Sequence, residues 1–183
     1  MRRATTMTAT KRLVLTAVNI ALCLVLPMAF HSIPNGGSIL LPMHIPVLLC
    51  GMVCGAPYGA VCGLLGPLLS GVVTGMPPAA VLPAMMVECA VYGLVTGLML
   101  RFVRTGRLYA DLYLSLIVSM LLGRVVSGIA KALVFQAGKY TLAAWVTASF
   151  VTALPGIVLQ LVAVPSIVYY LMRAGLLPQR YPK

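Results

Sequence analysis

The chain has 183 residues, of which 61% are hydrophobic and only 8% are charged, and its formal net charge is +11. Its mean hydropathy of +1.05 and its small share of charged residues lie far outside the range of soluble proteins, in which about 25% of residues are charged. This composition predicts an integral membrane protein. Since each spanning helix takes about 20 apolar residues, a separate soluble domain for catalysis or nucleic-acid binding is excluded.

Six apolar segments, separated by clusters of Pro, Gly and charged residues, are predicted to be transmembrane helices. The first follows a basic N-terminus, and its apolar run is too long for a typical signal peptide, so we expect a retained helix. The second is short for a full span. The predicted helices cover residues 12–30, 43–55, 58–75, 80–101, 111–136 and 146–172, within a single membrane domain over residues 1–183.

The basic residues predict the orientation of these helices. One cluster precedes the first helix, one follows the fourth and one follows the sixth. With six spans, the three clusters lie on one side, which the positive-inside rule makes cytoplasmic, so both termini are expected inside the cell. The clusters are Arg2, Arg3, Lys11 and Arg12; Arg101, Arg104 and Arg107; and Arg173, Arg180 and Lys183.

Two further basic residues, Arg124 and Lys131, lie inside the fifth predicted helix, where a charge costs about 2.5–3.5 kcal/mol on insertion scales. They are seven residues apart and therefore share one helix face, with Ser127 between them. In the fourth helix, Glu88 reaches a similar depth from the external side, and Tyr92 lies on the same face as Glu88. A contact between Glu88 and Arg124 is therefore expected.

Two interpretations of these charges remain open. In a purely structural one, Glu88 and Arg124 neutralise each other, and Lys131 extends to the external interface. In the other, the same cluster lines an externally open pocket for a polar solute. With one acidic residue against two basic ones, such a pocket has a net positive charge, which favours a carboxylate or phosphate group on the ligand.

The external loops add further candidates. Asn35 lies in the turn sequence PNGG, whose Gly36 and Gly37 would give hinge freedom to a lid. His44, at the start of the second predicted helix, is expected to be a helix cap or an interfacial residue rather than a ligand. The remaining polar and aromatic candidates are His31, Ser32, Lys139, Tyr140 and Trp145.

The sequence contains no catalytic motif. It lacks the His-Glu-x-x-His, Gly-x-Ser-x-Gly and phosphate-loop patterns. Only two acidic residues, Glu88 and Asp111, are available for acid–base chemistry, and the five cysteines lie in apolar segments without Cys-x-x-Cys spacing. We therefore predict no enzymatic activity, no metal and no cofactor. Any energy coupling is expected to come from an ion gradient or from partner proteins.

Small residues recur at every fourth position: Ala17 and Ala21 in the first helix, and Gly51, Gly55, Gly59 and Gly63 across the second and third. This spacing lets helices approach closely, within one chain or against another membrane protein. The segment LTAVNIALCLV, together with HIPVLLCGMVCGAPYGAVCGLLGPLLSGVVTGMPP, resembles the substrate-binding S component of an energy-coupling factor (ECF) vitamin transporter. The resemblance extends from about residue 10 to residue 173.

The resemblance implies an all-α bundle of six helices in the prokaryotic plasma membrane that binds a vitamin or related micronutrient outside the cell. It also implies two kinds of partner: a transmembrane coupling (T) component, which would dock on Ala17 and Ala21, and two cytoplasmic ATPases. Binding of nucleic acid is not expected. In similar proteins, the ligand lies among the outer ends of helices four to six, beneath the loop joining helices one and two. The implied substrate-binding residues are Glu88, Arg124, Lys131, Tyr92, Ser127 and Asn35.

The identity of the ligand does not follow from the resemblance, although the net positive pocket favours an anionic vitamin such as pantothenate or folate. Two other functions remain open. A stand-alone secondary transporter would use Glu88 as a proton-coupling carboxylate, but such carriers commonly contain inverted repeats, and the two halves of this chain do not match. A scaffold subunit would use only its Gly and Ala faces, would bind no ligand and would tolerate Arg124→Ala.

Overall fold

The structure is a computed structural model that describes residues 7–30, 34–135, 140–178 and 181, and all its regular elements in these ranges are helical. Six helices are long and apolar enough to cross a membrane, which confirms the predicted all-α membrane fold. The elements are α1 (Ala9–Ala29), α2 (Gly36–Leu40), α3 (His44–Cys54), α4 (Ala56–Thr74), α5 (Leu82–Phe102), α6 (Leu108–Ala130), η1 (Lys131–Phe135), α7 (Leu142–Val146), η2 (Thr147–Thr152) and α8 (Leu154–Arg173).

Two of the six spans differ in outline from the predicted segments. The second begins earlier than expected, because the short helix α2 precedes α3 and the two together run from Gly36 to Cys54. A residue in the left-handed region, Leu41 (φ 50°), separates them. The predicted segment 146–172 is interrupted at Ala153, where η2 ends and α8 begins. Pro155 stands in the first turn of α8, where a missing backbone N–H costs nothing.

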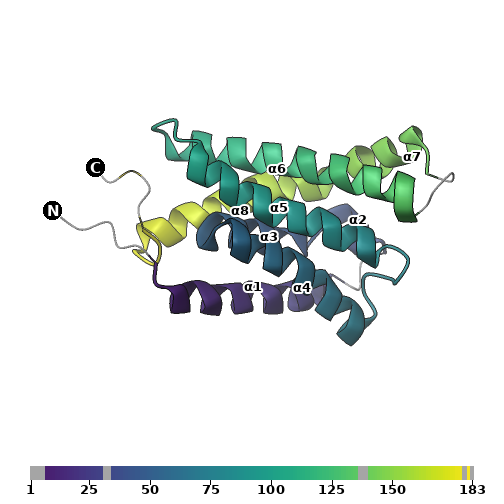
Figure 1. The fold of residues 1–183 in the computed structure, drawn as a ribbon, viewed down its shortest axis with the longest axis horizontal. Coiled ribbons are helices and arrows are strands. Elements are labelled where there is room, and N and C mark those ends of the chain that lie inside the picture. Colours follow the sequence, from purple (N-terminus) through teal and green to yellow (C-terminus); the bar gives the residue numbers. More distant parts are fainter. Residues whose placement is uncertain (1–6, 31–33, 136–139, 179–180, 182–183) are drawn as a thin grey trace.

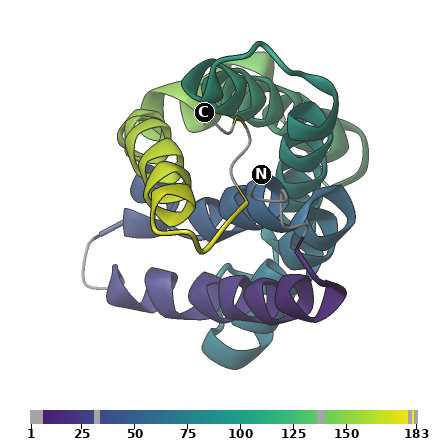
Figure 2. The same cartoon turned by 90° about the vertical axis from the view of Figure 1, so that its left-hand side faces the viewer.

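The long helices run side by side along one axis (Figure 1). The start of α1 and the end of α8 lie at the same end of the bundle, as the basic clusters predict, and the α5–α6 connection lies there too (Figure 1). The view along the bundle places α1 at its periphery (Figure 2). Burial agrees: 61% of the second span, which includes α3, is buried inside the protein, against 17% of α1. The second span is therefore the central element.

Glycines bring α3, α4 and α5 into backbone contact. A Cβ atom on Gly59 would lie 2.3 Å from the carbonyl oxygen of Gly93, and one on Gly63 would lie 2.2 Å from another α5 carbonyl oxygen. A Cβ atom on Gly51 would lie 2.4 Å from the Gly93 oxygen. The fourth member of the series, Gly55, forms the α3–α4 turn with a φ of +100°. The repeated glycines thus pack the helices of this one chain against each other.

The cytoplasmic end of the bundle is fixed by the second acidic residue, Asp111, which is 1% exposed. Its Oδ1 accepts hydrogen bonds from the backbone N–H of Thr105 (2.8 Å) and from the Thr105 hydroxyl (2.7 Å). Its Oδ2 accepts a third from the hydroxyl of Tyr181 (2.6 Å). These bonds tie the α5–α6 connection and the C-terminal segment to the first turn of α6.

Candidate functional site

A cavity of about 560 Å³ lies at the end of the bundle opposite to the start of α1 and the end of α8, within the size range of small-molecule sites. The end of α1, the connections that follow α1 and α4, and η2 form its wall, with α5 and α6 beside them. Most of this wall is apolar. Its polar lining includes Asn35, Ser38, His44, Glu88, Arg124, Lys131 and Ser149.

Three residues from α5 and α6 form a hydrogen-bonded chain at this cavity. The hydroxyl of Tyr92 donates to Glu88 Oε1 at 2.6 Å, and Arg124 Nε donates to the same hydroxyl oxygen at 3.1 Å. The part of the chain that the structure describes contains no direct ion pair between Glu88 and Arg124. The expected contact between the two charges is therefore made through the Tyr92 hydroxyl.

Close packing holds Tyr92 at this position. A Cβ atom on Gly123 of α6 would lie 2.2 Å from the Tyr92 ring, so the absence of a side chain there makes room for the phenol. On another side, the His44 ring contacts Tyr92 edge-on, with ring centroids 5.1 Å apart. Tyr92 itself is completely buried. Its hydroxyl is thus held between the two charged residues by the backbone of α6 and by α3.

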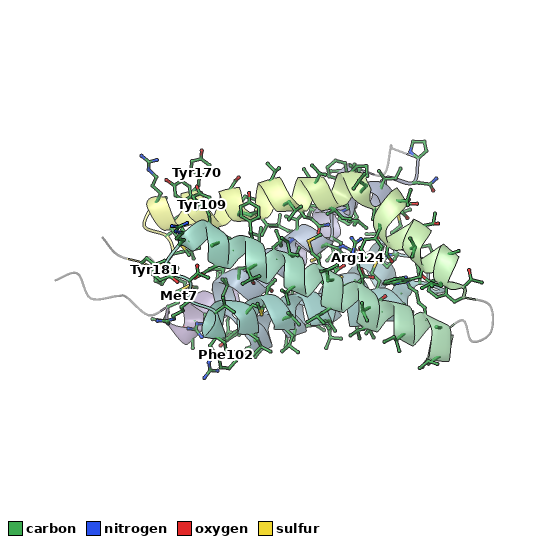
Figure 3. The ribbon with its side chains drawn as sticks, turned by 90° about the horizontal axis from the view of Figure 1, so that it is seen from above. Met7, Phe102, Tyr109, Arg124, Tyr170 and Tyr181 are labelled. Carbon is green, nitrogen blue, oxygen red and sulfur yellow. The ribbon has the colours of Figure 1, made fainter. Side chains whose placement is uncertain are left out.

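Arg124 is buried (3% exposed) and is held by aromatic residues of the α7–η2 segment. Its guanidinium carbon lies 5.5 Å from the centre of the Phe150 ring, and Trp145 Nε1 donates to its backbone oxygen at 3.0 Å. Figure 3 shows the Arg124 side chain between the helices, far from the labelled tyrosines at the cytoplasmic end. A guanidinium over an aromatic face is stabilised in this apolar setting.

His44 is a cavity residue, so its expected role as a helix cap or interfacial residue is wrong. The N-cap of α3 is Met43, and His44 is only 2% exposed. It lines the cavity, and neither ring nitrogen has a hydrogen-bond partner in the described structure. The cause is α2, which extends the second span outward and leaves His44 within the bundle. The sequence signal was its position in an otherwise apolar segment.

Of the other predicted site residues, two line the cavity and one does not. Lys131 and Asn35 both line the cavity; the Lys131 ammonium lies 5.8 Å from the centre of the Tyr140 ring. Asn35 adopts a left-handed conformation (φ 57°) just before α2, which Asn tolerates better than most residues. Ser127 lies between α6 and α5 and donates to the Ala84 carbonyl at 3.4 Å. It is not among the residues that line the cavity.

The remaining loop candidates divide into two groups. Gly36 and Gly37 line the cavity as the first residues of α2, and their role as hinges stays a prediction. Trp145 packs against Gly128 of α6 and supports Arg124 through its backbone. His31, Ser32 and Lys139 lie outside the described residues.

The predicted docking residues Ala17 and Ala21 lie on the exposed face of α1. Their neighbours on this face are large apolar residues, including Val14, Val18 and Leu22, which are 57%, 49% and 37% exposed. The opposite face of α1, with Thr16, Asn19 and Cys23, is buried against the bundle. The exposed face is suited to contact with lipid or with a partner helix.

Within the described ranges, no three His, Cys, Asp or Glu side chains converge to form a metal site. The five cysteines are free and buried. The described lining of the cavity presents charged, hydrogen-bonding and apolar side chains.

Comparison with known proteins identifies the family. The family model for the ECF transporter, substrate-specific component, matches residues 11–168. No curated protein and no solved structure matches the chain. Substrate-specific components are multi-pass subunits of the cell membrane that bind the substrate and associate with a T component and ATPase subunits. Because the match covers most of the chain and the structure has six membrane-length helices, this protein belongs to the substrate-specific components of ECF transporters.

Proposed function

We propose that the chain captures a vitamin or related micronutrient in the outer cavity and delivers it to the cytoplasm together with a T component and two ATPases. The observation that carries this proposal is the cavity itself. It is large enough for a small molecule, and polar or charged side chains reach it from three helices: His44 of α3 and Arg124 of α6, which are buried, and Glu88 of α5, which is partly exposed. Charged groups inside a membrane protein are costly and mark binding or transport sites.

The charge of the cavity supports an anionic ligand such as pantothenate or folate. Arg124 and Lys131 line it together with a single acidic residue, Glu88. The only other acidic residue, Asp111, lies at the opposite end of α6 from Lys131. One positive charge is therefore left without an acidic partner, and a carboxylate on the ligand would supply it.

The exposed face of α1 supports docking of the T component at Ala17 and Ala21. Two small side chains spaced by four residues let a partner helix approach the backbone closely. The wall of the cavity includes Pro27, in the last turn of α1, and Phe30, which caps that helix. Binding of the ligand and docking of the T component would therefore share one helix.

The test is thermal stability of the purified chain in detergent against a panel of vitamins and their precursors. A ligand present at 100 times its dissociation constant stabilises the folded state by about 2.7 kcal/mol. We expect one compound to raise the unfolding temperature, and Glu88→Gln to reduce this shift. If no compound stabilises wild-type protein that is folded and free of co-purified ligand, the proposal is wrong.

A further inference from the structure

The inner part of the cavity contains buried hydrogen-bonding groups that the protein leaves unpaired. Arg124 Nη1 and both ring nitrogens of His44 have no partner in the described structure, although both residues are more than nine-tenths buried. Both line the cavity. Buried donors without partners destabilise a protein, so such groups beside a cavity are the first candidates for contacts with a ligand.

Glu88 places a hydrogen-bond acceptor at the same inner site. One of its oxygens accepts from Tyr92, and the residue remains partly exposed to the cavity. The guanidinium of Arg124 bonds to the other side of the same hydroxyl. The charges of Glu88 and Arg124 therefore balance, and donors and an acceptor lie next to each other.

This arrangement fits an uncharged polar group better than a carboxylate. A carboxylate bound by Arg124 would lie close to the carboxylate of Glu88, and like charges repel strongly in a poorly solvated site. A group with both a donor and an acceptor can instead bond to Glu88 and to Arg124 or His44 at once. Amides, ureides and amino-substituted nitrogen heterocycles have this character.

Lys131 provides a separate site nearer to the outer end. It follows Arg124 by seven residues, which corresponds to about 10 Å along the helix axis. Neither of the two acidic residues in the sequence offsets it, because Glu88 is balanced by Arg124 and Asp111 is bound at the cytoplasmic end. Lys131 therefore carries the net positive charge of the cavity.

We propose that the ligand is held at two places: an uncharged donor–acceptor group binds at Glu88, Arg124 and His44, and an acidic group binds at Lys131. The ligand class is a small molecule in which an amide, ureide or nitrogen heterocycle stands about 10 Å from a carboxylate or phosphate. This inference rests on the proposed function and assigns a separate part of the ligand to each end of the cavity.

The experiment measures the affinity of the purified full chain for matched pairs of compounds that differ only in the acidic group. The pairs are pantothenate with panthenol, biotin with biotinamide, and folate with its diamide. In Lys131→Met, we expect the acid to lose about tenfold to 100-fold in affinity, as for a lost charged hydrogen bond, and the neutral partner to lose nothing. In Glu88→Gln, both members of the pair should weaken by the same factor.

Two further variants complete the design. His44→Phe should weaken both members of a pair equally, whereas His44→Gln, which keeps a donor, should restore part of the affinity. Arg104→Met removes one positive charge from the exposed α5–α6 connection and should change neither affinity. The unfolding temperature of each variant without ligand shows whether it has folded.

Two binding patterns would overturn the inference alone. The first is an unchanged preference for the acid in Lys131→Met combined with tighter binding of the acid in Glu88→Gln, which would put the carboxylate at the inner site. The second is equal affinity of the wild type for acid and neutral partner. A third result, in which the folded wild type binds no compound of a wider vitamin panel, would contradict the proposed function and the inference together.

Discussion

The two ends of the bundle each contain one of the two acidic residues, and they use them differently. At the cytoplasmic end, Asp111 is 1% exposed and accepts hydrogen bonds from Thr105 and Tyr181. At the outer end, Glu88 accepts one bond from Tyr92 and faces a cavity. The same chemical group is therefore part of a closed network at one end and part of an open site at the other.

This difference shows that hydrogen-bond partners within the protein distinguish structural polar groups from ligand-binding ones in a membrane protein. A buried polar group is costly unless it is paired. Where the protein supplies the partners itself, as at Asp111, the group stabilises the fold. Where a buried group beside a cavity is left without partners, as at Arg124 Nη1 and His44, it is available to a ligand. The following variants test this distinction.

The largest expected effect is on the packed centre of the bundle. In Gly93→Ala, the new Cβ would lie 2.1 Å from the Gly59 carbonyl oxygen, which only a shift of the backbone can relieve. We expect a loss of about 1–3 kcal/mol or more in the free energy of unfolding, the range for overpacked cores. Thermal unfolding in detergent measures it. Gly37→Ala is the control, because nothing lies within 4 Å of its Cβ position; equal losses in both variants would contradict the packing argument.

A paired experiment on the two acidic residues tests the comparison itself. Asp111→Asn weakens hydrogen bonds to a charged group, which contribute about 1.5–3 kcal/mol each, and should lower the stability of the protein without ligand. Glu88→Gln should instead lower the affinity for the ligand and change the stability without ligand much less. Unfolding temperatures with and without ligand separate the two effects. Lower affinity in Asp111→Asn together with lower ligand-free stability in Glu88→Gln would contradict the assignment of a structural role to Asp111 and a binding role to Glu88.

A smaller effect is expected for Tyr92→Phe, which removes only the hydroxyl between Glu88 and Arg124. The ring still fills the space above Gly123, so the fold should be kept. Ligand affinity should fall about fivefold to tenfold, the value of a typical hydrogen bond near 1 kcal/mol. Titration calorimetry measures it. Unchanged affinity would mean that the two charges keep their positions without the hydroxyl.

The smallest effect on the isolated chain is expected at the exposed face of α1. Ala17→Leu and Ala21→Leu add side chains on the exposed face of α1, so stability and ligand affinity should change by less than about 0.5 kcal/mol. Co-purification with the T component should be lost, because the larger side chains block close approach. Val14→Leu, on the same exposed side, is the control for added bulk. If both Ala17→Leu and Ala21→Leu still co-purify with the T component, docking at this position is ruled out.

The sequence allowed prediction of the features that depend on composition and period. Six apolar segments and the placement of Lys and Arg were enough for the six helices and for the shared end of α1 and α8. The cost of charge in a membrane was enough to single out Glu88 and Arg124. Both line the cavity in the structure.

Features that depend on local backbone geometry and on side-chain direction could not be predicted. The left-handed Leu41 separates α2 from α3, and α2 extends the second span outward, so His44, the first residue of α3, is buried at the cavity instead of lying at the membrane surface. The insertion of Tyr92 between Glu88 and Arg124 requires the space at Gly123, which lies on another helix. Spacing along one helix placed Ser127 with Arg124, but the packing of α5 directs it toward Ala84.

The most direct test of the account is the affinity of wild-type, Glu88→Gln and Asp111→Asn proteins for the compound that stabilises the wild type most. The account predicts saturable binding to one site per chain, weakened about tenfold or more by Glu88→Gln, the value of a charged hydrogen bond. It predicts unchanged affinity in folded Asp111→Asn. Equal affinity in all three proteins would contradict the claim that the outer cavity is the substrate site.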